Sequence, residues 1–87
     1  MLYFNPEFRD FFKKLPPPVQ KQAKKALSHF SEDQHYTSLQ FKCVNKRYAR
    51  YSMRINDNYR ALSYKQDGKF YWYWVGHHDM YIRKIAD

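Results

Sequence analysis

The sequence is poor in the residues and runs that mark several common classes of protein. A single cysteine, Cys43, excludes an internal disulfide and suits a reducing compartment. Two glycines, Gly68 and Gly76, are too few for a glycine-rich loop that cradles phosphate groups. No signal peptide is visible, and no apolar run approaches the ~18 residues that a membrane span needs. We therefore expect a cytoplasmic protein that does not act at a membrane.

Acidic residues are also scarce, with 8 Asp and Glu against 16 Lys and Arg, which gives a formal net charge of +8. This excess points to a polyanionic partner such as nucleic acid, a membrane surface or an acidic protein, and charge alone does not choose among them. The 87 residues suffice for one domain, spanning 1–87, whose modest core draws on the 21% of aromatic residues.

Helical spacing dominates the first part of the chain. Asn5-Pro6-Glu7 predicts a helix start with Asn5 as the N-cap, and the helix should end at the three prolines 16–18. A second helix is predicted from Pro17 or Pro18 to about Phe30, which makes an antiparallel helix hairpin. The apolar stripe of the second helix consists of Val19, Ala23, Ala26, Leu27 and Phe30.

Alternation of apolar and polar residues replaces helical spacing after Ser38. Strands are predicted over residues 39–44, 48–55, 59–66 and 69–75. The last of these holds six consecutive aromatic or β-branched residues, 70–75, and should be buried on both faces and central in its sheet. Residues 2–4 either add a very short edge strand or lead into the first helix.

A short closing helix is predicted over residues 78–85, with Tyr81, Ile82 and Ile85 as its apolar positions. The fold class is therefore α+β, with an N-terminal helix hairpin packed on a mainly antiparallel sheet of about four strands. Cys43 is interpreted as a small core residue of its strand and not as a nucleophile.

The lengths of two hairpin loops, three residues at 56–58 and two at 67–68, predict which side chains share a sheet face. The predicted pairs are Arg50–Tyr64, Ser52–Leu62, Arg54–Arg60, Tyr64–Tyr71, Leu62–Tyr73 and Arg60–Val75. The opposite face should pack on the helices and holds Ala49, Tyr51, Met53, Ile55, Tyr59, Ala61, Ser63, Phe70, Trp72 and Trp74. A one-residue slip would send arginines into the core.

This register gives the exposed face a basic and aromatic character. Arg54 and Arg60 repel each other unless an anion lies between them, and a guanidinium pairs well with phosphate. The predicted RNA-binding set consists of Arg50, Ser52, Tyr64, Tyr71, Tyr73 and His77, in which the tyrosine rings offer surfaces for stacked bases. Patterning alone does not distinguish this face from an ordinary solvated one.

Titratable residues gather after the last predicted strand, where His77, His78 and Tyr81 follow one another. A histidine near phosphate-binding arginines can transfer protons near neutral pH, and a tyrosine can orient it. Such a set cleaves RNA without a metal, because the 2′-hydroxyl is a built-in nucleophile. Adjacent histidines point in different directions and make a poor metal pair, so we predict no metal and no other cofactor.

Three motifs carry a family resemblance: Tyr51-Ser52-Met53-Arg54-Ile55, the strand from Tyr59 to Tyr64, and the ending from Trp74 to Tyr81. Together they resemble the RelE/ParE superfamily of bacterial toxins. The resemblance implies a type II toxin that cleaves mRNA on the ribosome and is neutralised by an antitoxin protein. We expect that partner to be acidic and encoded by the neighbouring gene.

The resemblance also implies roles for four catalytic residues. Arg60 matches the arginine that contacts the scissile phosphate, and Arg54 matches the basic residue of the preceding strand. His78 matches the basic or histidine position after the glycine, and Tyr81 matches the terminal tyrosine. Ser52 stands where RelE has further lysines, and no carboxylate base can be placed. Two alternatives therefore stay open, a toxin that inhibits DNA gyrase and a non-catalytic RNA-binding module.

Overall fold

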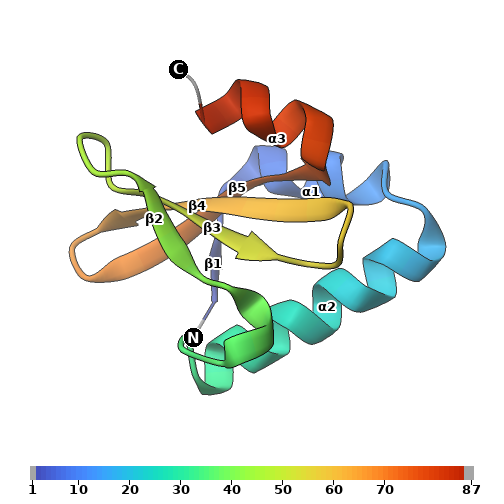
Figure 1. The fold of residues 1–87 in the computed structure, drawn as a ribbon, viewed down its shortest axis with the longest axis horizontal. Coiled ribbons are helices and arrows are strands. Elements are labelled where there is room, and N and C mark those ends of the chain that lie inside the picture. The colour runs from blue at the N-terminus through green and yellow to red at the C-terminus, as the bar shows by residue number, and fades with distance from the viewer. Residues whose placement is uncertain (1, 86–87) are drawn as a thin grey trace.

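The structure, a computed structural model, describes residues 2–85 and contains a five-stranded sheet with helices on both sides (Figure 1). The elements follow in the order β1 (Tyr3–Phe4), α1 (Pro6–Lys13), α2 (Pro17–Glu32), η1 (Thr37–Leu39), β2 (Lys42–Asn45), β3 (Arg50–Arg54), β4 (Tyr59–Gln66), β5 (Lys69–His77) and α3 (His78–Ile85). The predicted α+β class is confirmed. The sheet has one strand more than predicted, because residues 3–4 do form the short edge strand.

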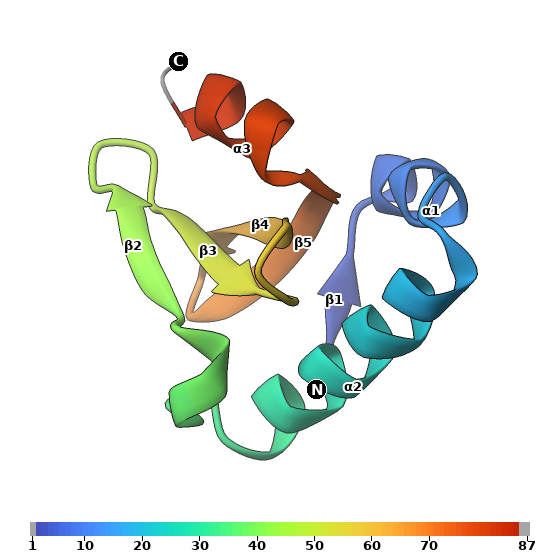
Figure 2. The same ribbon diagram turned by 45° about the vertical axis from the view of Figure 1, so that its right-hand side comes forward.

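The strands lie in the order β1-β5-β4-β3-β2, with β1 parallel to β5 and the remaining neighbours antiparallel. β5 is an interior strand as predicted, although β4 takes the middle place. Helix α2 runs across one face of the sheet and α3 lies over the other (Figure 2). We call these the α2 face and the α3 face.

The two N-terminal helices form close to their predicted bounds. Helix α1 has Asn5 at its N-cap position and proline at its start, but the Asn5 side chain makes no capping hydrogen bond. Its Oδ1 accepts a hydrogen bond from the Tyr64 hydroxyl instead, at 3.1 Å. All five residues of the predicted α2 stripe are buried. They form the main core with residues of the α2 face, among them Met53, Ala61 and Trp72.

The predicted strands over 39–44 and 48–55 are shorter than expected. Leu39 lies in the 3₁₀ turn η1, and Ala49 has a left-handed φ of 52°, so neither residue extends a strand. Cys43 is exposed, and its prediction as a core residue is wrong because β2 is the outermost strand of the sheet. The prediction that Ile82 is one of the apolar positions of α3 is also wrong, since Ile82 is 50% exposed, whereas Tyr81 is buried.

The register between β3 and β4 is the predicted one, with Arg50 opposite Tyr64, Ser52 opposite Leu62 and Arg54 opposite Arg60. Between β4 and β5 the pairing of Tyr64 with Tyr71 is confirmed, and a β-bulge then shifts the register. The pair Ser63–Trp72 still precedes the bulge, and the pairs after it are Leu62–Trp74, Ala61–Val75 and Arg60–Gly76. The predicted pairs Leu62–Tyr73 and Arg60–Val75 are therefore wrong.

The bulge exchanges the faces of two side chains. Val75 turns to the α2 face and joins the main core, while Trp74 turns to the α3 face. There Trp74 forms a second, smaller core with Leu62 and Tyr81, and this core seats α3 on the sheet. The prediction that Trp74 packs beneath the helix hairpin is wrong for the same reason.

Glycine at position 76 is required by the ring of Trp74. A Cβ atom on Gly76 would lie 2.6 Å from Trp74 Cζ2. We expect Gly76→Ala to lower the free energy of unfolding by about 1–3 kcal/mol, the usual cost of overpacking, in urea denaturation. Combined with Trp74→Leu, the same substitution should cost almost nothing more. An equal cost in both backgrounds would contradict this packing.

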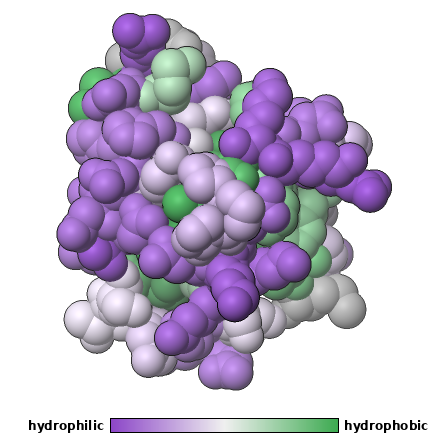
Figure 3. Space-filling model, turned by 90° about the vertical axis from the view of Figure 1, so that its right-hand side faces the viewer, coloured by the Kyte–Doolittle hydropathy of each residue, from purple (hydrophilic) through white to green (hydrophobic). Residues whose placement is uncertain are grey.

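The outer surface is predominantly hydrophilic on the side shown in Figure 3, where apolar side chains appear only in small patches. Within residues 2–85, no helix combines the length and the apolar character that crossing a membrane requires.

Candidate functional site

Three side chains from β4 and α3 meet on the α3 face. The guanidinium carbon of Arg60 lies 5.4 Å from the centre of the Tyr81 ring. His78 precedes Tyr81 by one helical turn, and their rings are 5.7 Å apart. Because Tyr81 is only 5% exposed, its ring is a fixed platform for the other two side chains. We call Arg60, His78 and Tyr81 the Arg60 cluster.

The second arginine of the predicted pair, Arg54, lies opposite Arg60 on β3. Its Nη2 donates a hydrogen bond to Asp57 Oδ1 at 2.5 Å, so a carboxylate of the β3–β4 loop holds this guanidinium. Arg60 is bound less completely. Its Nη2 donates to Gln40 Oε1 at 3.4 Å, and its Nη1 is buried without a hydrogen-bond partner among residues 2–85.

A buried donor that lacks an acceptor costs about 1–3 kcal/mol, more when it is charged. The structure therefore leaves Arg60 with a guanidinium nitrogen that lacks an acceptor, and a turn of this side chain that exposes the nitrogen would let an anion satisfy it. Repulsion between the paired arginines is relieved for Arg54 by Asp57 and for Arg60 by the face of the Tyr81 ring. A phosphate oxygen is an acceptor that suits the remaining nitrogen.

The two histidines point to different places. The backbone N–H of His78 donates to the carbonyl of Asn58 at 2.7 Å, which ties the start of α3 to the β3–β4 loop. His77 turns its ring toward Tyr59, 5.2 Å away, and its Nδ1 accepts a hydrogen bond from the backbone N–H of Asp79. His78 is therefore the histidine that joins the cluster, and His77 stays outside it.

The other predicted RNA-binding residues form a ladder farther along the α3 face. Arg50 lies over two neighbouring tyrosine rings, 5.2 Å from the centre of Tyr64 and 5.0 Å from that of Tyr73. Tyr64 in turn stacks on Tyr71, with 5.4 Å between ring centres and 19° between planes. The tyrosines share the predicted face and are partly buried against one another.

The family model for the ParE-like toxin domain matches residues 17–83, which include the Arg60 cluster, Arg54 and Arg50. The chain belongs to the ParE-like toxin domain family. The resemblance of its motifs to RelE/ParE toxins is thus confirmed at the level of a ParE-like toxin domain. Comparison of its sequence with curated proteins gives no match.

Solved structures share the fold of the ParE-like toxin at low sequence identity. A chain of the RelB–RelE antitoxin–toxin complex from Methanococcus jannaschii is 17% identical, with a TM-score of 0.76 over 95% of this chain and 98% of that one. A chain of the YoeB–YefM complex from Staphylococcus aureus is 18% identical, with a TM-score of 0.65 over 90% and 95%. A chain of the RelBE2 toxin–antitoxin complex from Mycobacterium tuberculosis is 20% identical, with a TM-score of 0.64 over 90% and 96%.

One predicted contact residue of the ParE-like toxin is inaccessible. Ser52 lies on the α3 face opposite Leu62, but it is 0% exposed and its hydroxyl has no hydrogen-bond partner among the described residues. The prediction that Ser52 touches RNA does not fit this position. Leu62, which lies opposite Ser52, belongs to the second core.

Sequence reasoning missed two residues that contact the paired arginines. Gln40, which reaches Arg60, follows η1 with a left-handed φ of 47°, an uncommon conformation for a residue other than glycine. The sequence pattern predicts Asp57 only as a residue of the hairpin loop 56–58. Its acidic side chain three residues after Arg54 was the available signal, because a short loop brings the two together. Among residues 2–85, no group of His, Cys, Asp and Glu could hold a metal ion.

Tyr73 should be recognisable by its titration. Burial raises the pKa of the Tyr73 phenol above its ordinary value of 10.0, and the Arg50 guanidinium partly opposes this. Because the unfolded chain loses this proton more readily, stability should be unaffected below about pH 10 and should fall above it.

Absorbance titration of phenolate checks this prediction. The difference between the wild type and Tyr73→Phe should report a pKa above the ordinary one, and Arg50→Gln should raise that pKa further, since it removes the opposing cation. A Tyr73 pKa at or below the ordinary value of 10.0 would contradict the burial of this phenol. A Tyr73 pKa that is lower in Arg50→Gln than in the wild type would contradict the role of the Arg50 cation.

Proposed function

We propose that this toxin is a metal-independent, ribosome-dependent mRNA endonuclease of a type II toxin–antitoxin system. The observation that carries the proposal is the buried and unpartnered Nη1 of Arg60, whose guanidinium lies against the Tyr81 ring that His78 also approaches, opposite a second arginine. An anion-binding guanidinium next to an imidazole is the combination that phosphate-ester cleavage requires.

In the proposed reaction the 2′-hydroxyl of the message attacks the adjacent phosphorus and the bond to the 5′-oxygen breaks. The products are a 2′,3′-cyclic phosphate and a free 5′-hydroxyl. Arg60, with Arg54 opposite, stabilises the charge that grows on the phosphate oxygens. His78 serves as the general acid or base. Tyr81, which is buried, holds the Arg60 guanidinium in place through its ring face.

The ladder of Arg50 and its tyrosines would continue the contact with the message along the α3 face. Cation–π pairs at 5.0 Å and 5.2 Å hold the Arg50 guanidinium over the rings of Tyr73 and Tyr64. Arginines interleaved with aromatic rings are the usual means of holding single-stranded nucleic acid.

An antitoxin is the proposed protein partner, in keeping with the antitoxin–toxin complexes that share the fold. A formal charge of +8 favours an acidic chain that covers the basic face. We expect the neighbouring gene to encode it. A short acidic protein that binds this toxin and restores growth would support the proposal.

Inhibition of DNA gyrase is the second candidate function, because the family description is ParE-like. Inducing the toxin in cells and mapping mRNA 5′ ends distinguishes the two. We expect new 5′ ends within coding regions soon after induction, while plasmid supercoiling stays normal. Growth arrest with intact transcripts and inhibited supercoiling would favour the gyrase function.

A further inference from the structure

A cleft lies next to Arg54, the residue of β3 opposite Arg60. It lies between α2, η1 and β3, has a volume of about 310 Å³, and includes Arg54 in its wall. Buried Leu39 and Ile55 also line it. This volume is at the lower end of the range of about 300–1,000 Å³ for small-molecule sites, which suits a single nucleotide. We call it the α2–η1 cleft.

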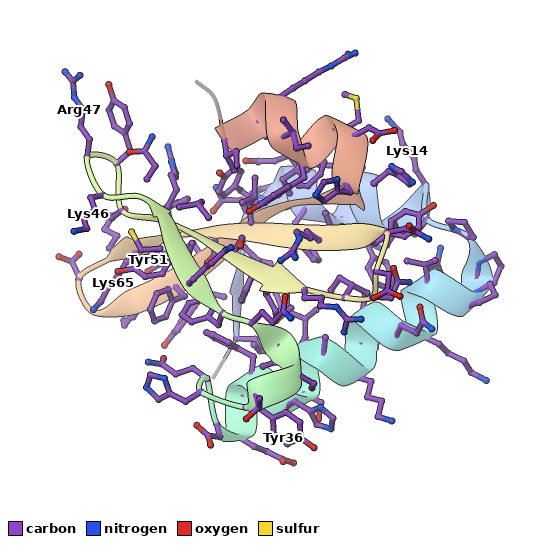
Figure 4. The ribbon with its side chains drawn as sticks, viewed as in Figure 1. Lys14, Tyr36, Lys46, Arg47, Tyr51 and Lys65 are labelled. Carbon is purple, nitrogen blue, oxygen red and sulfur yellow. The ribbon has the colours of Figure 1, made fainter. Side chains whose placement is uncertain are left out.

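An aromatic stack lines this cleft. The ring of His29, on α2, stacks on the ring of Tyr36, with 4.3 Å between centres and 20° between planes. Tyr36 stands beside η1, next to the end of α2 (Figure 4), and is 44% exposed. A large exposed aromatic ring that is already held by a stacked neighbour offers a base a pre-ordered surface.

The charge of the cleft suits a phosphodiester. Lys25 and Arg54 line it, and none of the described residues that line it is acidic. The Asp57 carboxylate holds the Arg54 guanidinium through Nη2, and the remaining N–H groups of Arg54 are the ones that would bind a phosphate. The turn η1 also joins the cleft to the Arg60 cluster, because Gln40, the residue after η1, is the one that contacts Arg60.

We propose that the α2–η1 cleft binds one nucleotide of single-stranded RNA next to the nucleotide that is cut. The base stacks on Tyr36, and Lys25 and Arg54 contact its phosphate. The inference rests on the proposed RNA cleavage and adds a substrate subsite to it. A message would then lie across Arg54, with the Arg50 ladder on one side and this cleft on the other.

Oligonucleotide binding tests the subsite. The probes are 2′-O-methyl oligonucleotides, which cannot be cut, as a dinucleotide and a pentanucleotide. Tyr36→Leu should weaken binding of the pentanucleotide roughly tenfold, the effect of one lost base stack, and should leave dinucleotide binding unchanged. Phe4→Leu is the matched control, because Phe4 is 46% exposed and lines a groove between α1 and α2 instead.

Salt dependence tests the phosphate contact. Lys25→Gln should lower the magnitude of the slope of log K against log salt by about one, whereas Lys21→Gln, on α2 but outside the cleft, should change it less.

If Tyr36→Leu binds the pentanucleotide as tightly as Phe4→Leu does, while Arg60→Ala still weakens binding, the subsite is wrong and the proposed cleavage stands. If the wild type binds no oligonucleotide, the subsite is also wrong, and mRNA cleavage in cells decides the proposed function separately. Equal loss of duplex DNA binding in Tyr36→Leu would overturn the preference for a single strand.

Discussion

Replacing Arg60 by alanine should lower the rate of mRNA cleavage by a factor on the order of 10²–10³, the usual effect of removing one preorganised donor to a charged transition state. The fold should survive this change. Arg60 makes one long hydrogen bond, at 3.4 Å, and its Nη1 has no partner among residues 2–85. Its removal also relieves repulsion with Arg54, so we expect the free energy of unfolding to change by less than about 1 kcal/mol.

Single-turnover cleavage of ribosome-bound mRNA, with urea denaturation of the same proteins, measures both effects. Arg60→Lys should recover little activity, because an ammonium cannot bind phosphate bidentately. Lys65→Ala is the matched control, since Lys65 is an exposed cation on the same strand, outside the cluster. Full cleavage by Arg60→Ala, or a loss equal to that of Lys65→Ala, would show that the cluster is not the catalytic site.

Replacing Trp74 by alanine should have the largest effect on stability outside the main core. Trp74 is 3% exposed and packs with Leu62 and Tyr81 beneath α3, so its loss should cost about 3–5 kcal/mol. Because this small core seats α3, hydrogen exchange should speed up most in residues 78–85. Cleavage should fall as well, since Tyr81 would no longer hold Arg60 in place.

Ile82→Ala provides the comparison on the same helix. Ile82 is 50% exposed, and its truncation should change stability by no more than about 0.5 kcal/mol. If Trp74→Ala were as mild as Ile82→Ala, or if it accelerated exchange in α2 and not in α3, the second core would not have the role assigned to it.

Local patterns predicted the part of the site that depends on one short loop. Three turn residues, 56–58, determine the pairing of β3 with β4, and this pairing places Arg54 opposite Arg60 as the structure shows. The closing helix was predicted at its observed bounds, 78–85, which placed His78 and Tyr81 one turn apart. These features need only spacing along the chain.

Features that depend on tertiary packing could not be predicted in this way. The bulge at Tyr73 lies in a run of aromatic residues whose side chains fit either face of the sheet. Alternation of apolar and polar residues therefore could not show that Trp74 and Val75 lie on the faces opposite to those predicted. The burial of Ser52, which lies opposite Leu62 of the second core, likewise depends on how the sheet is covered and not on spacing along the chain. The α2–η1 cleft combines residues of the consecutive elements α2 and η1 with Arg54 and Ile55 at the end of β3, and only the tertiary fold brings these together.

A single 2′-deoxy substitution in the message tests the proposed chemistry most directly. Purified toxin would be added to ribosomes carrying an mRNA with a mapped cut, and to the same complex with a 2′-deoxynucleotide on the 5′ side of that cut. We expect the unmodified message to yield a 2′,3′-cyclic phosphate and a 5′-hydroxyl, and the modified message to stay intact at that position. Equal cleavage of both messages would contradict attack by the 2′-hydroxyl, and cleavage of neither would contradict the proposed endonuclease.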